Sequence, residues 1–223
     1  MLLHKLNLNH LSREVRRDLA SPYELHSTLC RAFSTAEKKC QAGTFLWRLE
    51  TSKNKNSHPI LLVQSTVLPD WSRIELKDWF EEIPDKPLNL TSLLSLENIQ
   101  KNQRFRFRLR ANPSICRKGK RQGLFNLVDQ EKWIASKGIL HGFKLSELPS
   151  FAMEDRHDLD LMISEDQMLR GLQRSGHEIK IYSVLFDGIL TVTDKDKFLS
   201  VIKSGIGHGK MMGLGLLSLA PIR

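Results

Sequence analysis

Cysteine, negative charge and long apolar runs are all scarce in this sequence of 223 residues. The three cysteines, Cys30, Cys40 and Cys116, are odd in number and widely spaced. That spacing excludes a disulfide framework and the usual zinc-binding patterns. No stretch approaches the ~20 apolar residues of a membrane-spanning helix, and residues 1–10 lack the continuous apolar core of a signal peptide. The sequence therefore predicts a cytoplasmic protein whose thiols stay reduced.

The shortage of acidic residues leaves a strongly basic chain. Lysine and arginine number 34 against 25 aspartates and glutamates, which gives a net charge of +9 and a pI near 9.6. Such a balance favours a polyanionic partner, either a nucleic acid or an anionic membrane surface. The chain lacks the basic amphipathic helix with exposed aromatic residues that is typical of membrane-surface proteins. Nucleic acid is therefore the favoured partner, and no membrane partner is expected.

The hydrophobic periodicity predicts an α+β fold with two tandem ferredoxin-like (RRM-like) βαββαβ domains. In the first half, Ser21, Pro22 and Glu24 supply the N-cap, first-turn proline and capping box of a helix. This helix is expected to run to about Lys39, and a shorter helix is expected after Asp70. Strands are expected at residues 2–8, 44–50, 60–68 and 104–110.

The second half repeats the plan less clearly. Strands are expected at residues 124–127, 138–145, 179–186, 189–193 and 213–219, and helices at residues 129–137 and from residue 194. The predicted boundary near Pro113 divides the chain into an N-terminal domain of residues 1–113 and a C-terminal domain of residues 114–223. A single larger α+β domain is the alternative interpretation.

One predicted strand is unusually basic. Because side chains alternate across a strand, its apolar residues Phe105, Phe107 and Leu109 face one side and its arginines face the other. These arginines are Arg104, Arg106, Arg108 and Arg110. A row of guanidinium groups on the open face of a ferredoxin-like sheet suits a phosphate backbone. The alternative is a solvated face whose charge is balanced by acids from elsewhere in the fold.

A second basic cluster follows the strand. It consists of Arg117, Lys118, Lys120 and Arg121 around Gly119. We interpret this segment as a flexible loop able to clamp a nucleic-acid backbone. The two clusters together strengthen the prediction of a nucleic-acid partner.

Three segments resemble the marker segments of a known family. They are residues 16–26 (RRDLASPYELH), 107–113 (FRLRANP) and 205–218 (GIGHGKMMGLGLLS). In their sequence and order they are similar to CasE, the endoribonuclease that processes CRISPR repeats in type I-E systems. The resemblance implies a tandem ferredoxin-like fold that binds the repeat stem-loop of precursor RNA and cuts it without a metal ion or cofactor. It also implies that the mature guide RNA is retained with other CRISPR-associated subunits in a surveillance complex.

The resemblance assigns the catalytic group to Tyr23 and His26, with Arg31 assisting where some members have lysine. Tyr23 and His26 are i, i+3 neighbours on the polar side of the predicted helix, whereas Arg31 lies farther around it. A histidine can take the proton of an attacking 2′-hydroxyl or supply one to the departing 5′-oxygen. The expected ends are a 2′,3′-cyclic phosphate and a 5′-hydroxyl. The sequence leaves the acid and base roles of His26 open.

Two further segments are candidates for RNA contact. Gly207, Gly209 and Lys210 lie in a glycine-rich stretch that the family places against RNA, although a tight helix-to-strand turn is the alternative. The stretch is not a nucleotide-binding P-loop, because Met211 follows Lys210. Arg170 and Arg174 resemble the family's basic hairpin, which enters the major groove of the RNA stem. The competing function is a non-catalytic RNA-binding scaffold subunit of the same fold.

Overall fold

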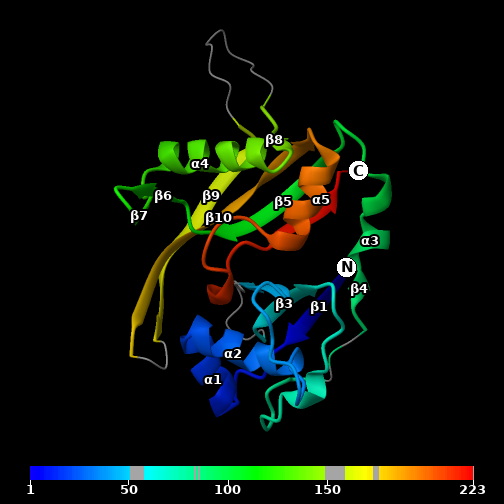
Figure 1. The fold of residues 1–223 in the computed structure, drawn as a ribbon, viewed down its shortest axis with the longest axis vertical. Helices are drawn as coiled ribbons and strands as arrows, with labels where there is room; N and C mark the ends of the chain where they lie inside the picture. Colours follow the sequence, from blue (N-terminus) through cyan, green and yellow to red (C-terminus); the bar gives the residue numbers. More distant parts are fainter. Residues whose placement is uncertain (51–57, 83, 85, 149–158, 173–175, 223) are drawn as a thin grey trace.

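Figure 1 shows the fold as a computed structural model, which describes residues 1–50, 58–82, 84, 86–148, 159–172 and 176–222. The N-terminal half, drawn in blue and cyan, lies below the C-terminal half. Each half consists of a twisted antiparallel sheet with helices against one face. Among the described residues, no helix combines the length and apolar character needed to cross a membrane.

The N-terminal half is a four-stranded sheet in the order β2-β3-β1-β4. Its strands are β1 (Leu2–Asn7), β2 (Phe45–Glu50), β3 (Ile60–Ser65) and β4 (Leu88–Asn89). After β1 come α1 (Arg13–Ala20), which is not among the predicted elements, and α2 (Pro22–Ala32). Leu25 and Leu29 of α2 share a buried core with Phe45 and Trp47 of β2. The helix therefore covers one face of this sheet.

The C-terminal half is a larger sheet in the order β11-β5-β10-β8, with β9 paired to β10. Its strands are β5 (Arg104–Ala111), β8 (Phe143–Leu145), β9 (Leu161–Leu172), β10 (Glu178–Val192) and β11 (Leu217–Pro221). The helices α4 (Leu127–Leu140) and α5 (Lys195–Ser204) cover one face. Trp133 of α4 stacks on Phe186, and Phe198 of α5 stacks on Phe105.

Shorter elements complete the chain. They are η1 (Trp71–Arg73), α3 (Leu90–Leu93), η2 (Leu96–Asn98), the β6 (Ser114–Arg117) and β7 (Lys120–Gly123) hairpin, and η3 (Lys210–Met212). Both large sheets have the strand order of the ferredoxin-like plan, with β1 and β3 as the central pair of one and β5 and β10 as the central pair of the other. In the second sheet β9 is an additional strand beside β10. The predicted tandem ferredoxin-like fold is confirmed.

The basic strand belongs to the second sheet, and its prediction as the last strand of the first sheet is wrong. β5 pairs with β10 and β11, and β4 takes the fourth place in the first sheet. Phe105, Phe107 and Leu109 of β5 are buried in the core beneath α4 and α5. β5 thus precedes the predicted boundary near Pro113 but packs with the residues that follow it, whereas residues 124–126 are not a strand.

Two predicted helices are shorter than expected. α2 ends at Ala32 rather than near Lys39, because Phe33 stacks on Phe45 and the Ser34 hydroxyl donates to the Cys30 carbonyl oxygen at 2.7 Å. Asp70 caps only η1, accepting from the Ser72 N–H at 3.2 Å.

Candidate active site and nucleic-acid interface

His26 lies half-buried on α2 against an aromatic wall from β2. Its ring centroid is 5.1 Å from that of Phe45, and the Trp47 indole N–H donates to its Nδ1 at 3.3 Å. On the other side of the ring, Nε2 lies 3.7 Å from the Cys30 Sγ. Burial lowers the pKa of His26 to about 4. His26 is therefore a neutral imidazole at physiological pH.

Tyr23 lies one turn before His26, where α2 meets β9 and η3. A Cβ built on the buried Gly171 of β9 would approach the Cβ of Tyr23 and the Cε of Met212 to 3.2 Å each. Only a glycine fits such a close approach without displacing its neighbours. The β9 strand and the glycine-rich segment therefore converge on the helix that carries both candidate catalytic residues.

Arg31 does not join this group. It is exposed in the last turn of α2, which stays a regular helix to Ala32. Within the described part of the chain, its side chain makes no hydrogen bond or ion pair. An assisting role for Arg31 stays a prediction and requires that bound RNA draw the side chain in.

The arginines of β5 share one face, as predicted, but differ in environment. Arg104 and Arg106 are exposed and form no ion pair with any described residue. Arg108 pairs with Asp187 of β10 at 2.7 Å and with Glu50 of β2 at 3.3 Å. Arg110 is only 5% exposed and pairs with the carboxylate of Glu165. Acids from β2, β9 and β10 therefore pair with two of the four arginines, as the alternative interpretation expects for part of the row, and RNA contact by the row stays a prediction.

A buried arginine joins the two sheets next to this row. The Arg48 guanidinium of β2 donates to the carbonyl oxygens of Arg108 and Leu216, each at 3.2 Å, and to Glu50 at 2.8 Å. Burial lowers its pKa, and the neighbouring Glu50 opposes this effect. On β3, the Gln64 amide donates to the Ile202 carbonyl oxygen at 2.7 Å. The second face of the N-terminal sheet is therefore covered by the C-terminal half.

Replacing Arg48 by alanine should lower the free energy of unfolding by about 2–3 kcal/mol, because two buried carbonyl oxygens and Glu50 lose their donor. Thermal or urea unfolding of Arg48→Ala measures the loss. The exposed Arg106→Ala is the matched control and should change stability by no more than ~0.5 kcal/mol. Equal stability of the two variants would contradict the buried network.

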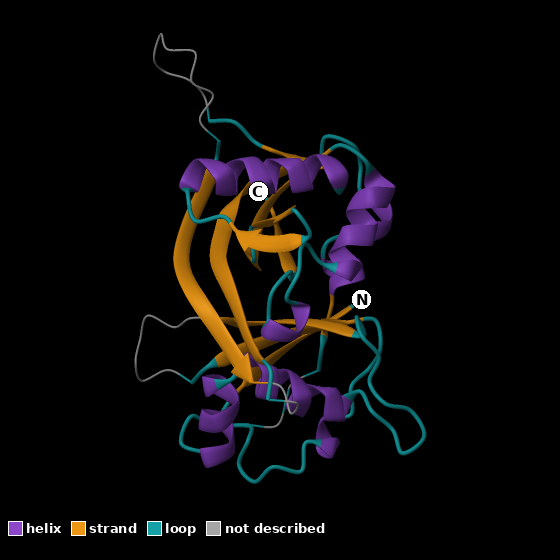
Figure 2. Ribbon diagram, turned by 60° about the vertical axis from the view of Figure 1, so that its left-hand side comes forward, coloured by secondary structure: helices purple, strands orange, loops and turns teal. Residues whose placement is uncertain are grey.

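Two hairpins carry the remaining basic residues. The predicted loop at residues 117–121 is instead the ordered β6–β7 hairpin, whose turn holds Lys118 at φ 49° and Gly119 at φ 74°. Its basic side chains, Arg117, Lys118, Lys120 and Arg121, are all exposed. Figure 2 shows β9 and β10 as a long pair that reaches from α4 down to α1 and α2. Arg170 is exposed on β9 opposite Lys180, and Arg174 lies outside the described residues.

The glycine-rich segment is a close-packed loop between the two sheets. The Gly215 N–H donates to the Arg110 carbonyl oxygen and the Ile206 N–H to the Gly215 carbonyl oxygen, at 2.8 and 2.9 Å. A Cβ on Gly213 would lie 2.7 Å from the Trp47 ring. The tight-turn interpretation therefore holds for the end of this loop, while Gly207, Gly209 and Lys210 remain partly exposed.

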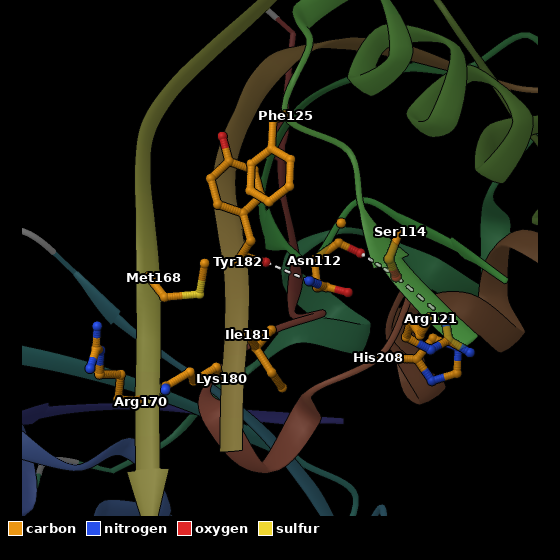
Figure 3. A pocket seen from close by; sticks show the side chains of 11 residues that line it. Asn112, Ser114, Arg121, Phe125, Met168, Arg170, Lys180, Ile181, Tyr182 and His208 are labelled. Carbon is orange, nitrogen blue, oxygen red and sulfur yellow. Dashed lines mark hydrogen bonds between the residues drawn. The ribbon is translucent and has the colours of Figure 1, made fainter. Parts of the chain in front are cut away.

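A groove of about 400 Å³ lies between the β9–β10 pair and β6 (Figure 3). Phe125, 66% exposed, meets the Tyr182 ring at a centroid distance of 4.5 Å. The cationic side chains on its walls come from Arg121, Arg170 and Lys180. Such a combination of cations and an exposed ring suits single-stranded or looped RNA.

Three basic side chains lie near His208 at the groove. Burial lowers its pKa most, and the charges of Arg121, Lys137 and Lys210 lower it further. The loop, the β6–β7 hairpin and α4 therefore concentrate positive charge at one place. Sequence reasoning missed Phe125, Tyr182 and Lys137 here, because no local pattern brings residues so far apart in the chain together.

Residues 1–221 match the profile of a family described as CRISPR associated protein. Over 228 residues the chain is 36% identical to the CRISPR-associated endoribonuclease Cse3 of Thermus thermophilus, covering 99% of this chain and 100% of that protein. The chain belongs to the Cse3/CasE family. It is also 28% identical over 223 residues to the CRISPR system Cascade subunit CasE of Escherichia coli, with 95% and 96% of the two chains covered.

A solved structure of a Cse3/CasE family member agrees with the fold. Thermus thermophilus Cse3, bound to an RNA representing a pre-cleavage complex, has a TM-score of 0.80 and 36% identity, with 99% of this chain and 98% of that chain covered. Family membership confirms the predicted resemblance and the predicted enzyme class, an endoribonuclease of CRISPR systems. Among the described residues, no group of three or more His, Cys, Asp and Glu side chains could hold a metal ion. Independence from metals stays a prediction.

Proposed function

We propose that this chain binds the stem-loop of a CRISPR repeat in precursor RNA and cuts it by attack of a 2′-hydroxyl on the adjacent phosphorus. No metal ion takes part, and the ends are a 2′,3′-cyclic phosphate and a 5′-hydroxyl. The cut RNA is kept as guide RNA with other CRISPR-associated subunits in the cytoplasm. The observation that carries the proposal is the convergence of α2, the β9–β10 pair and the glycine-rich loop around Tyr23 and His26.

The proposed cleavage requires two proton movements and the stabilisation of negative charge near Tyr23 and His26. The 2′-hydroxyl must lose a proton while the phosphorane gains negative charge and the 5′-oxygen departs. Neutral His26 and the Tyr23 hydroxyl can each donate a hydrogen bond to these oxygens. The exposed cation of Arg31 and the partly exposed Lys210 can balance charge on the phosphate if RNA brings them within reach.

The RNA is held by the exposed cations of three surfaces. They are Arg104 and Arg106 of β5, the β6–β7 hairpin, and the β9–β10 pair with Arg170. Gly207 and Gly209 allow the backbone to approach a phosphate closely. Arg108 is exposed and can also reach a phosphate, whereas the buried Arg110 supports the surface through its pair with Glu165. The double-stranded stem is recognised by shape and backbone rather than by base edges.

The second candidate is a non-catalytic RNA-binding scaffold. One observation favours it: both ring nitrogens of His26 already face protein atoms, Trp47 Nε1 and Cys30 Sγ. The contact with sulfur is weak at 3.7 Å, so an oxygen of the RNA can replace it. We therefore favour the catalytic function.

The deciding experiment is incubation of the purified protein with an end-labelled repeat hairpin in excess EDTA. Cleavage with a 2′,3′-cyclic phosphate on the 5′ fragment is expected. A hairpin with a single 2′-deoxy nucleotide before the cut should bind and stay intact, because the nucleophile is gone. Binding without any cleavage would show that the protein is a scaffold. Cleavage of the deoxy hairpin would show that water, and not the 2′-hydroxyl, attacks the phosphorus.

A further inference from the structure

The contact between Trp47 and His26 determines where His26 carries its proton. An indole nitrogen is a donor only, so the Trp47 N–H requires an unprotonated Nδ1 as its acceptor. A neutral imidazole carries one proton, which must then lie on Nε2. The geometry therefore selects one of the two neutral tautomers of His26.

Trp47 is held firmly enough to impose this choice. It is 2% exposed, lies in the core with α2, and has its ring pressed against the backbone of Gly213. The close approach requires a residue without a side chain, and Gly213 also has a φ of 78°. The end of the glycine-rich loop thus packs directly against the indole ring.

The surroundings of His26 also oppose a second proton. An imidazolium would place an N–H on Nδ1 against the N–H of Trp47. The ring faces Phe45 and Trp47 from β2 and the Cys30 thiol from its own helix, and burial raises the pKa of Cys30 to about 12. Burial is the cause of the lowered pKa of His26, and no charged neighbour contributes to it. The other titratable groups of these elements are Tyr23, Glu24 and Arg31 on α2, Arg48 and Glu50 on β2, Glu165, Asp166 and Arg170 on β9, and Lys210 on η3.

We propose that Trp47 is a positioning residue that holds His26 as the neutral tautomer protonated at Nε2, so that His26 acts as a hydrogen-bond donor to the scissile phosphodiester and not as the base for the 2′-hydroxyl. This proposal rests on the proposed function. In the reaction the 2′-oxygen–phosphorus bond forms and the phosphorus–5′-oxygen bond breaks. The 2′-hydroxyl proton passes to water, the 5′-oxygen takes a proton from water, and the Nε2–H stabilises the negative charge in between.

The tautomer can be measured on the wild-type protein without RNA. In ¹⁵N NMR spectra across pH 5 to 8, Nδ1 of His26 should be unprotonated and Nε2 protonated throughout, with His26→Gln assigning the signals. A proton on Nδ1, or an imidazolium at pH 7, would overturn the proposal. This measurement tests the tautomer proposal independently of the proposed function. A protein that failed to cleave the repeat hairpin would still show which tautomer of His26 is present.

Trp47→Phe removes the donor and keeps most of the ring. Nδ1 of His26 then loses its donor, so the tautomer protonated at Nδ1 should appear beside the Nε2 form in the ¹⁵N spectra, and single-turnover cleavage at pH 7.5 should fall roughly 3- to 10-fold, the range that one hydrogen bond supports. RNA affinity should change less than about twofold, because Trp47 is buried.

The chain offers a matched control. The Trp71 indole N–H donates to Nδ1 of the buried His4 at 3.1 Å, and the Trp71 ring meets Phe33 at the C-terminal end of α2. Trp71→Phe makes the same chemical change and should remove the donor to Nδ1 of His4 while leaving the His26 tautomer and cleavage unchanged. If Trp47→Phe and Trp71→Phe slowed cleavage equally, with His26 unaltered in both, the loss would be one of stability and Trp47 would have no positioning role.

Discussion

His26→Ala is expected to lose about 10²- to 10³-fold in cleavage rate, the usual loss when one hydrogen-bond donor to the transition state is removed. Its affinity for the repeat hairpin should stay close to that of the wild type, because binding comes from exposed cations on other elements. Single-turnover cleavage and a filter-binding titration measure the two quantities separately. His26→Ala leaves α2 intact, since alanine is the best helix former.

His58→Ala is the matched control for this variant. His58 is half-exposed just before β3, and its Nδ1 lies 3.3 Å from the Glu81 carboxylate. It should cleave at the wild-type rate. If His26→Ala retained full activity, the reacting group would have to lie elsewhere, and the next residue to test would be Lys210 of η3.

The triple variant Arg117→Ala, Lys120→Ala and Arg121→Ala is expected to weaken RNA binding roughly 10²-fold at low salt. Each lost phosphate contact lowers the number of counterions that RNA binding releases. The slope of log Kd against log salt should fall by about three, roughly one per contact. Lys118 is left in place because its φ of 49° is part of the turn. All three replaced side chains are exposed, so stability should hardly change.

A second triple variant has the same charge change at another place. Lys144 on β8 and Lys195 and Lys203 on α5 are exposed on elements away from the β6–β7 hairpin in Figure 1. Replacing these three by alanine should leave the affinity and the salt slope close to the wild type. Equal losses from both triple variants would show that net charge alone, rather than the hairpin, attracts the RNA.

The start of α2 and the alternation within β5 could be predicted because both depend on neighbours in the sequence. Ser21, Pro22 and Glu24 are sufficient to begin a helix, and a strand alternates its side chains whatever sheet it joins. The marker segments around Tyr23 and His26 were likewise readable without a structure, and family membership confirmed what they resemble. The sequence by itself therefore determined the fold class, the family and the candidate catalytic helix.

The environment of each side chain was decided by the tertiary structure alone. The sheet that β5 joins depends on β10 and β11, and Arg108 meets an acid 79 residues away in Asp187. The sequence places His26 on the polar side of its helix, but Trp47, 21 residues later, decides which nitrogen keeps the proton. Local patterns reflect backbone geometry and burial on one element. Charge pairing and protonation depend on contacts between elements, which only the folded chain brings together.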